Sequence, residues 1–388
     1  MNKIERLLNR FINKAVHFLL WLQAKMLIKH GKDFVFFNHI MDPSWNYKPY
    51  VHKINPYFKK YGFEYSTMEG EYYKELSGVE SDLYIPQTFF YYYLYPFLNR
   101  AGYRQDKNMM RKLLGEKSSP KKVEFIMPRQ IIYNMEGVFY TSDDEMCSVD
   151  DAVSIIMNYS DDIIVKPATN TTWGKGVVLL LNQEKTEKKI RELFSQYKKD
   201  FLFEEKIIQH SDLAAFNETS LNTIRIVTYR KLSGEIKFLF ALQRFGGPGS
   251  VVDNASAGGG FVALSEEGYV DRTIRNYKSI KTKRLDESFA ERIPYFQKLK
   301  EVAVHLHTRL PYLNYIGWDM SVTQGGIPVL IEFNTMPAVV AKQMSSGPVF
   351  CKEDLDEIMP KIAQWSLGYN CFPTICFPNR KEYRGRIR

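Results

Sequence analysis

The sequence near the C-terminal end contains two apolar runs on either side of a glycine pair. The runs are Tyr315–Val322 and Ile327–Asn334, and the pair is Gly325-Gly326. Runs rich in β-branched and aromatic residues that flank Gly-Gly are typical of a β-hairpin with a two-residue turn. In that register Asp319 on the first strand lies directly opposite Glu332 on the second. The chain must therefore fold so that two carboxylates meet across one ladder.

Two carboxylates in an apolar hairpin need a positive partner. Asn334 shares the face of Glu332, because alternate residues of a strand point to the same side. Like charges opposite each other on a sheet are destabilising, and burial increases the cost. Oxygen ligands without His or Cys favour a hard cation, so we expect Mg²⁺ at Asp319, Glu332 and Asn334. Alternatively, a three-residue loop would shift the register and turn Asp319 to solvent.

Composition places the chain among ordinary globular proteins. Its 388 residues suffice for two or three subdomains, and 45% are hydrophobic while 25% are charged. Cys147, Cys351, Cys371 and Cys376 form no CxxC pair, and no secretory leader is recognisable, which predicts a cytoplasmic protein. The net charge of +9 favours anionic partners such as nucleotide phosphates, acidic glycans or anionic lipid.

Residues 1–32 form a separate basic segment. It carries seven lysines and arginines against one acid, and its apolar residues recur at helical spacing. The pattern predicts an amphipathic helix that is too short in its apolar stretch to span a membrane. Such a helix could lie on an anionic membrane surface at the inner face, or it could pack on the protein body or on a twin helix.

Two further segments stand out by composition. Residues 84–103 are dense in aromatics, which could stack on sugar rings or could form core. The C-terminal part, residues 346–388, ends in a basic stretch with few apolar residues and reads as a helix followed by a solvated tail.

The middle of the chain contains a candidate phosphate-binding hairpin. A short apolar strand ends on Lys166, a loop of small and polar residues follows, and a second strand begins at Val177. Gly174 and Gly176 permit backbone geometry in which N–H groups cradle phosphate oxygens. The spacing is not that of a P-loop, and a Gly-rich hairpin alone is a weak signal.

Two strands follow with polar residues in unusual places. Phe201–Ile208 is an apolar strand interrupted by Glu204 and Glu205, as in a hinge that meets a polar ring edge. Ser220–Tyr229 is a strand with Arg225 in its middle. An arginine on such a strand requires an anion or a carboxylate partner.

The order of these elements resembles the ATP-grasp superfamily from about Lys107 to Pro337. Four stretches resemble more closely the sugar-transfer associated ATP-grasp proteins, relatives of the α-L-glutamate ligases: Leu221–Arg225, Val252–Gly260, Gly317–Asp319 and Ile331–Asn334. Those relatives are bacterial proteins linked to surface-polysaccharide synthesis.

The resemblance implies an α+β fold in which two α+β subdomains grip ATP, with an N-terminal helical extension. Residues 104–345 would form the catalytic domain, with a flap and hinge subdomain at about 160–215. The aromatic-rich region 33–103 would precede it.

The resemblance also implies three groups of site residues. The first would contact ATP phosphates through two lysines and a flap: Lys107, Lys166, Thr171, Thr172, Gly174, Lys175 and Gly176. The second would hold adenosine: Glu205 with Glu204 as its rival, the backbone of Lys206 and Ile208, and Asp212 at the ribose. The third would carry Mg²⁺ and meet the transferred phosphoryl group: Asp319, Glu332, Asn334, Arg225 and Arg244. Lys107 and Asp212 could instead be surface charges, and Arg244 a structural ion-pair partner.

The implied function is an ATP- and Mg²⁺-dependent carboxylate–amine ligase that works through an acyl phosphate. Its partners would be ATP, an anionic sugar or polysaccharide acceptor and an amine donor, and not nucleic acid. Residues 252–260 could line the acceptor site or form an ordinary turn. Two alternatives remain open, a kinase that phosphorylates a hydroxyl and a non-catalytic, membrane-associated glycan-binding protein.

Overall fold

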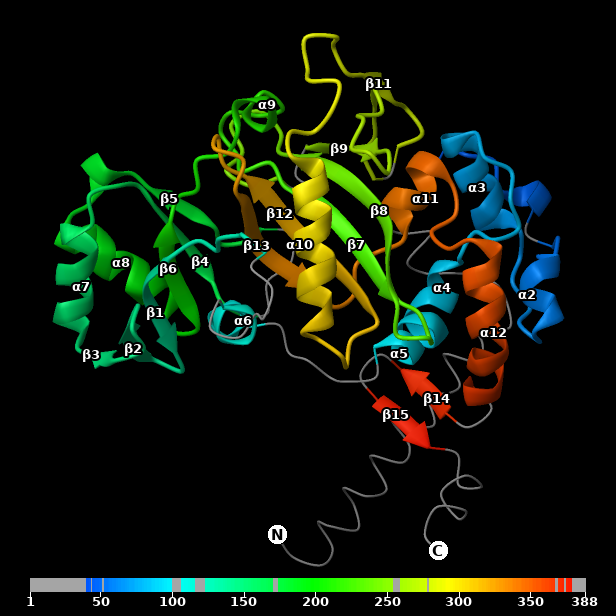
Figure 1. The fold of residues 1–388 in the computed structure, drawn as a ribbon, viewed down its shortest axis with the longest axis horizontal. Coiled ribbons are helices and arrows are strands. Elements are labelled where there is room, and N and C mark those ends of the chain that lie inside the picture. Colours follow the sequence, from blue (N-terminus) through cyan, green and yellow to red (C-terminus); the bar gives the residue numbers. More distant parts are fainter. Residues whose placement is uncertain are drawn as a thin grey trace, which may run out of the picture. The chain divides into compact units, whose positions relative to one another are not determined.

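The computed structural model describes residues 40–42, 44–50, 52–99, 106–115, 123–169, 174–253, 259–277, 279–366, 369–372 and 375–378. The predicted N-terminal helix, the basic tail from residue 379 onward, and Thr171 and Thr172 lie outside these residues. The chain divides into two units (Figure 1). The helical unit comprises Met1–Leu98, Tyr277–Ile280 and Ala338–Arg388, and the two-sheet unit comprises Asn99–Asn276 and Lys281–Pro337.

The smaller half of the two-sheet unit is a six-stranded sheet with the order β3-β2-β1-β6-β4-β5. Every pairing in it is antiparallel. Its strands are β1 (Gln130–Met135), β2 (Val138–Thr141), β3 (Met146–Cys147), β4 (Ile163–Pro167), β5 (Val178–Leu180) and β6 (Phe201–Glu205). β4 and β5 are the hairpin predicted around the Gly-rich loop.

Two capped helices accompany this sheet. Figure 1 shows α7 (Val149–Asn158) and α8 (Glu187–Tyr197) side by side next to it. Ser148 and Asp151 form a capping box at the start of α7, and Thr186 accepts a hydrogen bond from the Lys189 amide at the start of α8. Both helices bury apolar side chains in the core that holds this sheet together.

The larger half is a five-stranded sheet with the order β13-β12-β7-β8-β9. Its strands are β7 (Ile224–Arg230), β8 (Ile236–Phe245), β9 (Gly260–Leu264), β12 (Tyr315–Val322) and β13 (Pro328–Asn334). The helix α10 (Phe296–Thr308) runs along one face of it (Figure 1).

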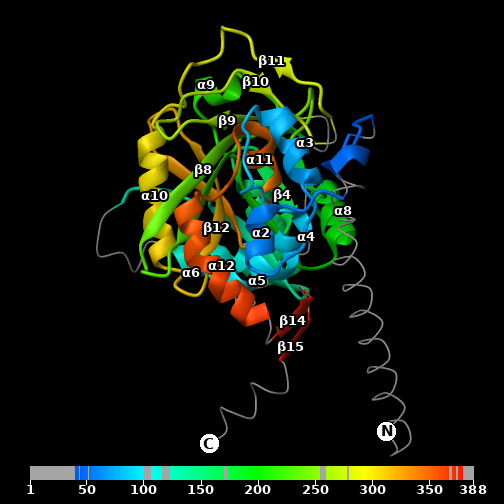
Figure 2. The same cartoon turned by 90° about the vertical axis from the view of Figure 1, so that its right-hand side faces the viewer.

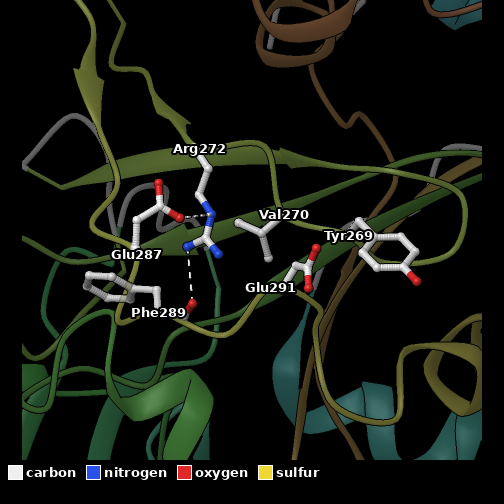
Figure 3. Close-up of a pocket in the computed structure, with 6 residues that line it drawn as sticks. All are labelled: Tyr269, Val270, Arg272, Glu287, Phe289 and Glu291. Atoms are coloured by element: carbon white, nitrogen blue, oxygen red, sulfur yellow. Dashed lines mark hydrogen bonds and ion pairs between the residues drawn. The ribbon is translucent and has the colours of Figure 1, made fainter.

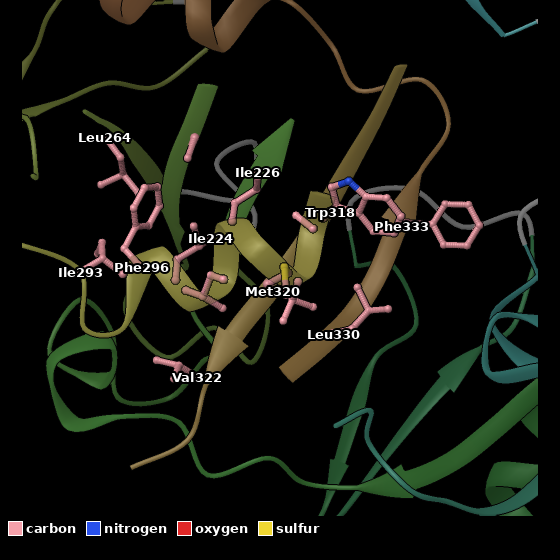
Figure 4. Close-up of a cluster of buried hydrophobic side chains, with 14 of the residues drawn as sticks. Ile224, Ile226, Leu264, Ile293, Phe296, Trp318, Met320, Val322, Leu330 and Phe333 are labelled. Carbon is pink, nitrogen blue, oxygen red and sulfur yellow. The ribbon is translucent and has the colours of Figure 1, made fainter. Parts of the chain in front are cut away.

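Alternation along the central strands separates a core face from a site face. Ile226, Trp318 and Met320 are fully buried in the core beneath α10, and Figure 4 shows them together with Phe296 of that helix. Successive side chains of a strand point to opposite faces, so the odd-numbered residues of β7 and β12 face away from α10. That opposite face carries Arg225 and Asp319.

The described part of the two-sheet unit also contains five smaller elements. They are α6 (Lys107–Leu114), α9 (Ser211–Ala214), the 3₁₀ turn η5 (Asn182–Glu184) and the strand pair β10 (Thr273–Ile274) and β11 (Lys283–Arg284).

The helical unit is built on buried aromatic side chains. Its elements are η2 (Lys48–Tyr50), α2 (Pro56–Lys60), α3 (Met68–Ser77), α4 (Gln87–Phe89), η3 (Phe90–Leu94), α5 (Tyr95–Leu98), α11 (Val340–Ser346), α12 (Lys352–Ser366), β14 (Tyr369–Phe372) and β15 (Ile375–Pro378). Figure 2 shows α3 and α11 side by side. Tyr84, Phe89, Phe90 and Phe97 are buried, so these aromatics form core.

Within the residues that the structure describes, no helix has the length and apolar character needed to cross a membrane.

Candidate active site

The β12–β13 hairpin brings Asp319 opposite Glu332, as predicted, but by a different route. The turn is not the predicted two-residue turn, because Thr323 pairs with Ile327 and three residues form the loop. That loop alone would shift the register by one residue. A bulge at Ile331, between the pairs Met320–Leu330 and Asp319–Glu332, restores the register before the site is reached.

Arg225 is the partner that the buried Asp319 requires. The two residues lie opposite each other on β7 and β12. The Arg225 Nε donates to Asp319 Oδ1 at 2.6 Å, and its Nη2 donates to Oδ2 at 2.5 Å. This two-bond geometry is the strong form of an arginine–carboxylate pair. It confirms the expectation that an arginine on this strand has an anionic partner.

Two further side chains donate to the same carboxylate. Arg244 on β8 donates from Nη1 to Asp319 Oδ2 at 3.0 Å, and Asn334 donates from Nδ2 to the same oxygen at 3.2 Å. Burial opposes ionisation of Asp319, but the Arg225 and Arg244 guanidinium groups hold its pKa well below the ordinary value. The carboxylate is therefore charged at neutral pH.

The oxygen-bearing residues at this end of the hairpin have the chemistry that Mg²⁺ requires. Glu332 carries a half-buried carboxylate, and Asn334 donates through Nδ2, which leaves its Oδ1 as a ligand atom. The described residues hold no cluster of three or more His, Cys, Asp and Glu suited to a metal. Two carboxylates and one amide on β12 and β13 nevertheless form an oxygen donor set that would fit Mg²⁺ once the Asp319 carboxylate turns from its arginines.

A second buried ion pair lies on the smaller sheet. The Lys166 Nζ on β4 donates to the Glu204 carboxylate on β6, and both side chains are 9% exposed. Burial raises the pKa of Glu204, and the nearby Lys166 charge opposes that rise. Glu204 therefore lies beside the predicted phosphate lysine, while Glu205 is turned elsewhere: its Oε1 accepts from the Arg129 amide at 2.9 Å.

Lys107 links the two sheets. It is the first residue of α6, and its backbone N–H donates to Ala168, just after β4, at 3.0 Å. Its Nζ lies 3.6 Å from Glu332 Oε2 on β13. The charge of Lys107 lowers the pKa of Glu204, and the charge of Glu332 raises it. Charged residues associated with both sheets therefore influence the same buried carboxylate.

Four of the cations predicted at the site have an acidic partner in the structure. Lys107 pairs with Glu332, Lys166 with Glu204, and the two arginines with Asp319. An arriving phosphate chain would replace carboxylates as the partner of these cations. The positive and negative charges at the site balance one another, and a bound anion would exchange places with the carboxylates.

The predicted hinge follows β6 directly. Lys206 forms an ion pair of 3.0 Å with Asp162, and the Ile208 side chain is exposed. Asp212 lies in α9 with its carboxylate 3.7 Å from His210 Nδ1.

The described part of the predicted flap contacts the loop that follows β8. Gly174 and Gly176 have φ values of +65° and +78°, which a side chain disfavours. A Cβ at Gly174 would lie 2.8 Å from Val252 Cγ1. Lys175 is exposed between the two glycines. The flap glycines are therefore required both by backbone conformation and, at Gly174, by a close neighbour.

Two residues that support the site were not predicted. Asp253 contacts Arg244, and Asn99 binds the backbone of both Tyr315 and Thr335 at the ends of β12 and β13. Asp253 lies in the stretch 252–260 but received no role of its own from the sequence, and Asn99 belongs to no motif. Their partners are 9 to 236 residues away in the sequence, so only the folded chain brings them together.

A separate cavity of about 720 Å³ lies elsewhere in the two-sheet unit. It is lined by Tyr269, Val270, Arg272, Glu287, Phe289 and Glu291 (Figure 3). Arg272 donates from Nη1 to the Phe289 carbonyl at 3.1 Å. None of the residues predicted for nucleotide or metal lines this cavity.

Comparison with known proteins identifies one family. The family described as sugar-transfer associated ATP-grasp matches residues 103–358. Among curated proteins, none matches this sequence significantly.

Several solved structures are distantly similar. An N5-carboxyaminoimidazole ribonucleotide synthetase bound to ADP is 12% identical at a TM-score of 0.36, over 61% of this chain and 45% of that one. The ATP-grasp ligase PsnB, complexed with minimal precursor, Mg and ADP, is 12% identical at a TM-score of 0.38, over 67% of this chain and 59% of that one. The VanG D-Ala:D-Ser ligase from Enterococcus faecalis is 14% identical at a TM-score of 0.37, over 68% of this chain and 61% of that one. The match thus spans about half of the first chain and about three fifths of the other two, and likeness this distant carries no argument about substrate.

Proposed function

The chain belongs to the sugar-transfer associated ATP-grasp family, and from this premise we propose that it is an ATP- and Mg²⁺-dependent carboxylate–amine ligase. We propose further that it amidates a sugar acid in bacterial surface-polysaccharide synthesis, on the cytoplasmic side where ATP is supplied. The observation that carries the proposal is the convergence of Lys107, Lys166, Arg225 and Arg244 with the oxygen set on β12 and β13.

The lysines bind the phosphate chain in this proposal. Lys166 exchanges its contact with Glu204 for a contact with a phosphate oxygen, and Lys107 exchanges its contact with Glu332 in the same way. Exchange of one anionic partner for another keeps each lysine charged and hydrogen-bonded throughout. The hinge at Glu205, Lys206 and Ile208 holds adenine, and Asp212 contacts the ribose.

The arginines act on the group that is transferred. A carboxylate oxygen of the acceptor attacks the γ-phosphorus, the bond to the bridging oxygen breaks, and ADP leaves. Arg225 and Arg244 stabilise the charge on the phosphoryl oxygens and bring two anions together, which is the main electrostatic task of such a site. Magnesium held by Asp319, Glu332 and Asn334 would neutralise further phosphate charge.

The second half-reaction needs no protein nucleophile. The amine attacks the acyl carbon of the acyl phosphate, inorganic phosphate leaves, and the nitrogen loses a proton to give the amide. The loop at 252–260 is suited to line the acceptor.

Hydroxylamine trapping tests this chemistry. The full-length protein is incubated with Mg-ATP, hydroxylamine and each member of a panel of uronic acids, and the products are analysed by mass spectrometry. We expect a hydroxamate in equal amount to ADP, because hydroxylamine takes the place of the amine. Chelation of Mg²⁺ should abolish it. A phosphorylated hydroxyl group with no hydroxamate from any acceptor would place the protein among kinases instead.

A further inference from the structure

Asp253 lies in the loop after β8 and binds two residues of the site face. Its Oδ2 accepts from the Thr223 amide at 3.1 Å and from the Thr223 hydroxyl. Its Oδ1 accepts from Arg244 Nη2 at 3.3 Å. The side chain is 14% exposed, so these contacts are largely shielded from water.

Arg244 is held by carboxylates on both sides. Its Nη1 donates to Asp319 and its Nη2 donates to Asp253, at 3.0 and 3.3 Å. Arg225 differs, because its two hydrogen bonds of 2.5 and 2.6 Å both go to Asp319. When the Asp319 carboxylate takes another partner, Arg244 still has Asp253 to fix its guanidinium plane.

The loop that carries Asp253 is anchored at several points. Asn217 Nδ2 donates to the Gly247 carbonyl at 2.8 Å, and Thr219 Oγ1 donates to the Ser250 carbonyl at 2.8 Å. A Cβ at Gly246 would lie 2.5 Å from the Val252 carbonyl, so the loop packs tightly against its own start. A carboxylate on such a loop has a defined position before any ligand binds.

We propose that Asp253 is a positioning residue, which holds Arg244 where the guanidinium meets the transferred phosphoryl group. The inference rests on the proposed function in one respect, namely that this site transfers a phosphoryl group. It applies to a ligase and to a kinase alike, because both pass through that step.

The test uses a phosphoryl mimic and needs no acceptor. Binding of Mg-ADP is measured by calorimetry with and without aluminium fluoride, which forms a planar mimic of the transferred group beside ADP. We expect the wild type to bind ADP more tightly with the fluoride complex. The Mg-ADP affinity of Asp253→Asn should stay within about two-fold of the wild type. The gain in affinity that aluminium fluoride causes should be about 10- to 100-fold smaller in the variant, the effect of losing a charged hydrogen bond.

Three variants separate positioning from a general structural role. Asp253→Glu should restore part of the tightening, because the carboxylate returns at a similar place. In a protein that already carries Arg244→Met, Asp253→Asn should not reduce the fluoride-dependent gain in affinity any further, because Asp253 acts through Arg244. Asp271→Asn, which removes a carboxylate from the buried Arg275 at 2.7 Å, should leave the tightening unchanged.

Several results would overturn the inference. One is equal loss of ADP binding with and without fluoride in Asp253→Asn, and another is additive loss in the double variant. A wild type that gains nothing from fluoride would also overturn it, together with the phosphoryl site itself. Failure to trap a hydroxamate, with the fluoride effect intact, would instead remove only the ligase chemistry.

Discussion

Asp319 on β12 and Arg225 on β7 lie opposite each other and share two hydrogen bonds of 2.5 and 2.6 Å. The carboxylate side chain is 3% exposed, whereas that of the arginine is 21% exposed. A buried acid thus holds a more exposed cation. This relationship fixes the direction of the guanidinium without any ligand.

Arg225→Lys should lower turnover far more than nucleotide affinity. The lysine keeps the charge but loses the planar fork, so it cannot bind Asp319 and a phosphoryl oxygen in the same geometry. We expect kcat for ADP formation to fall on the order of 100-fold, while Mg-ADP affinity changes less than about three-fold. Arg230→Lys is the control, because Arg230 is on the same strand but donates to the His307 carbonyl. Equal losses in kcat and in affinity would contradict this role.

Lys166→Met should weaken Mg-ADP binding by about 10- to 100-fold in calorimetry, the effect of losing a charged contact. The variant also leaves Glu204 buried without its partner, which lowers stability. The double variant Lys166→Met/Glu204→Gln should therefore recover thermal stability but not affinity.

Lys185→Met provides a matched control for the loss of a buried lysine. Lys185 is as buried as Lys166, and its Nζ donates to the carbonyls of Tyr159 and Asp161 at 2.5 and 2.6 Å. We expect it to reduce stability and leave affinity unchanged. Unaltered affinity in Lys166→Met would exclude Lys166 from the phosphate site.

Site residues could be identified from the sequence where they interrupt the apolar pattern of a strand. Asp319, Glu332 and Arg225 were identified because an acid or an arginine on an apolar strand needs a partner. The bulge at Ile331 was not predictable, since the sequence there is an unbroken apolar run. The turn prediction was wrong for the same reason: Gly-Gly fits a two-residue turn and a three-residue loop equally well.

Partners distant in sequence were beyond prediction. Glu204 was weighed as a contact of adenine, and the structure shows it paired with Lys166, 38 residues earlier, because β6 lies next to β4. Asp253 reaches Arg244 and Thr223 through a loop whose path depends on its packing against Gly246. Such contacts arise from tertiary structure and leave no periodic signal.

Gly174→Ala should weaken Mg-ADP binding several-fold, because the alanine is strained at a φ of +65° and its Cβ meets Val252 at 2.8 Å. The conformational part costs about 1 kcal/mol. Val252→Ala in the same chain should relieve the steric part and restore some affinity. Gly234→Ala controls for positive φ alone, since nothing lies within 4 Å of its Cβ position. A double variant no better than Gly174→Ala would show that the flap does not rest on Val252.

His307 should make the unfolding free energy depend on pH. It is fully buried in a chain of hydrogen bonds: Trp318 Nε1 donates to Thr228 Oγ1, Thr228 to His307 Nδ1, and His307 Nε2 to the Leu313 carbonyl. Burial lowers the pKa of His307 to about 4, and the Arg230 charge acts in the same direction. The unfolded chain, with a pKa of about 6.5, binds the proton first.

This difference stabilises the fold above pH 6.5 by about 3 kcal/mol, and the contribution is lost as the pH falls from about 6.5 to about 4. In His307→Gln the slope of unfolding free energy against pH should flatten over that window, as measured by urea denaturation. His305→Gln removes an imidazole from the same helix as a control. An unchanged slope in His307→Gln would contradict the assigned neutral state.

Oxygen transfer from the acceptor is the most direct measure of the proposed reaction. The acceptor carboxylate is labelled with ¹⁸O, and the phosphate released during amide formation with Mg-ATP is analysed by mass spectrometry. Attack of the carboxylate on the γ-phosphorus predicts one ¹⁸O atom in each phosphate, because the acyl oxygen leaves with phosphorus. Phosphate without ¹⁸O, or label retained in a phosphoester product, would contradict carboxylate activation at this site.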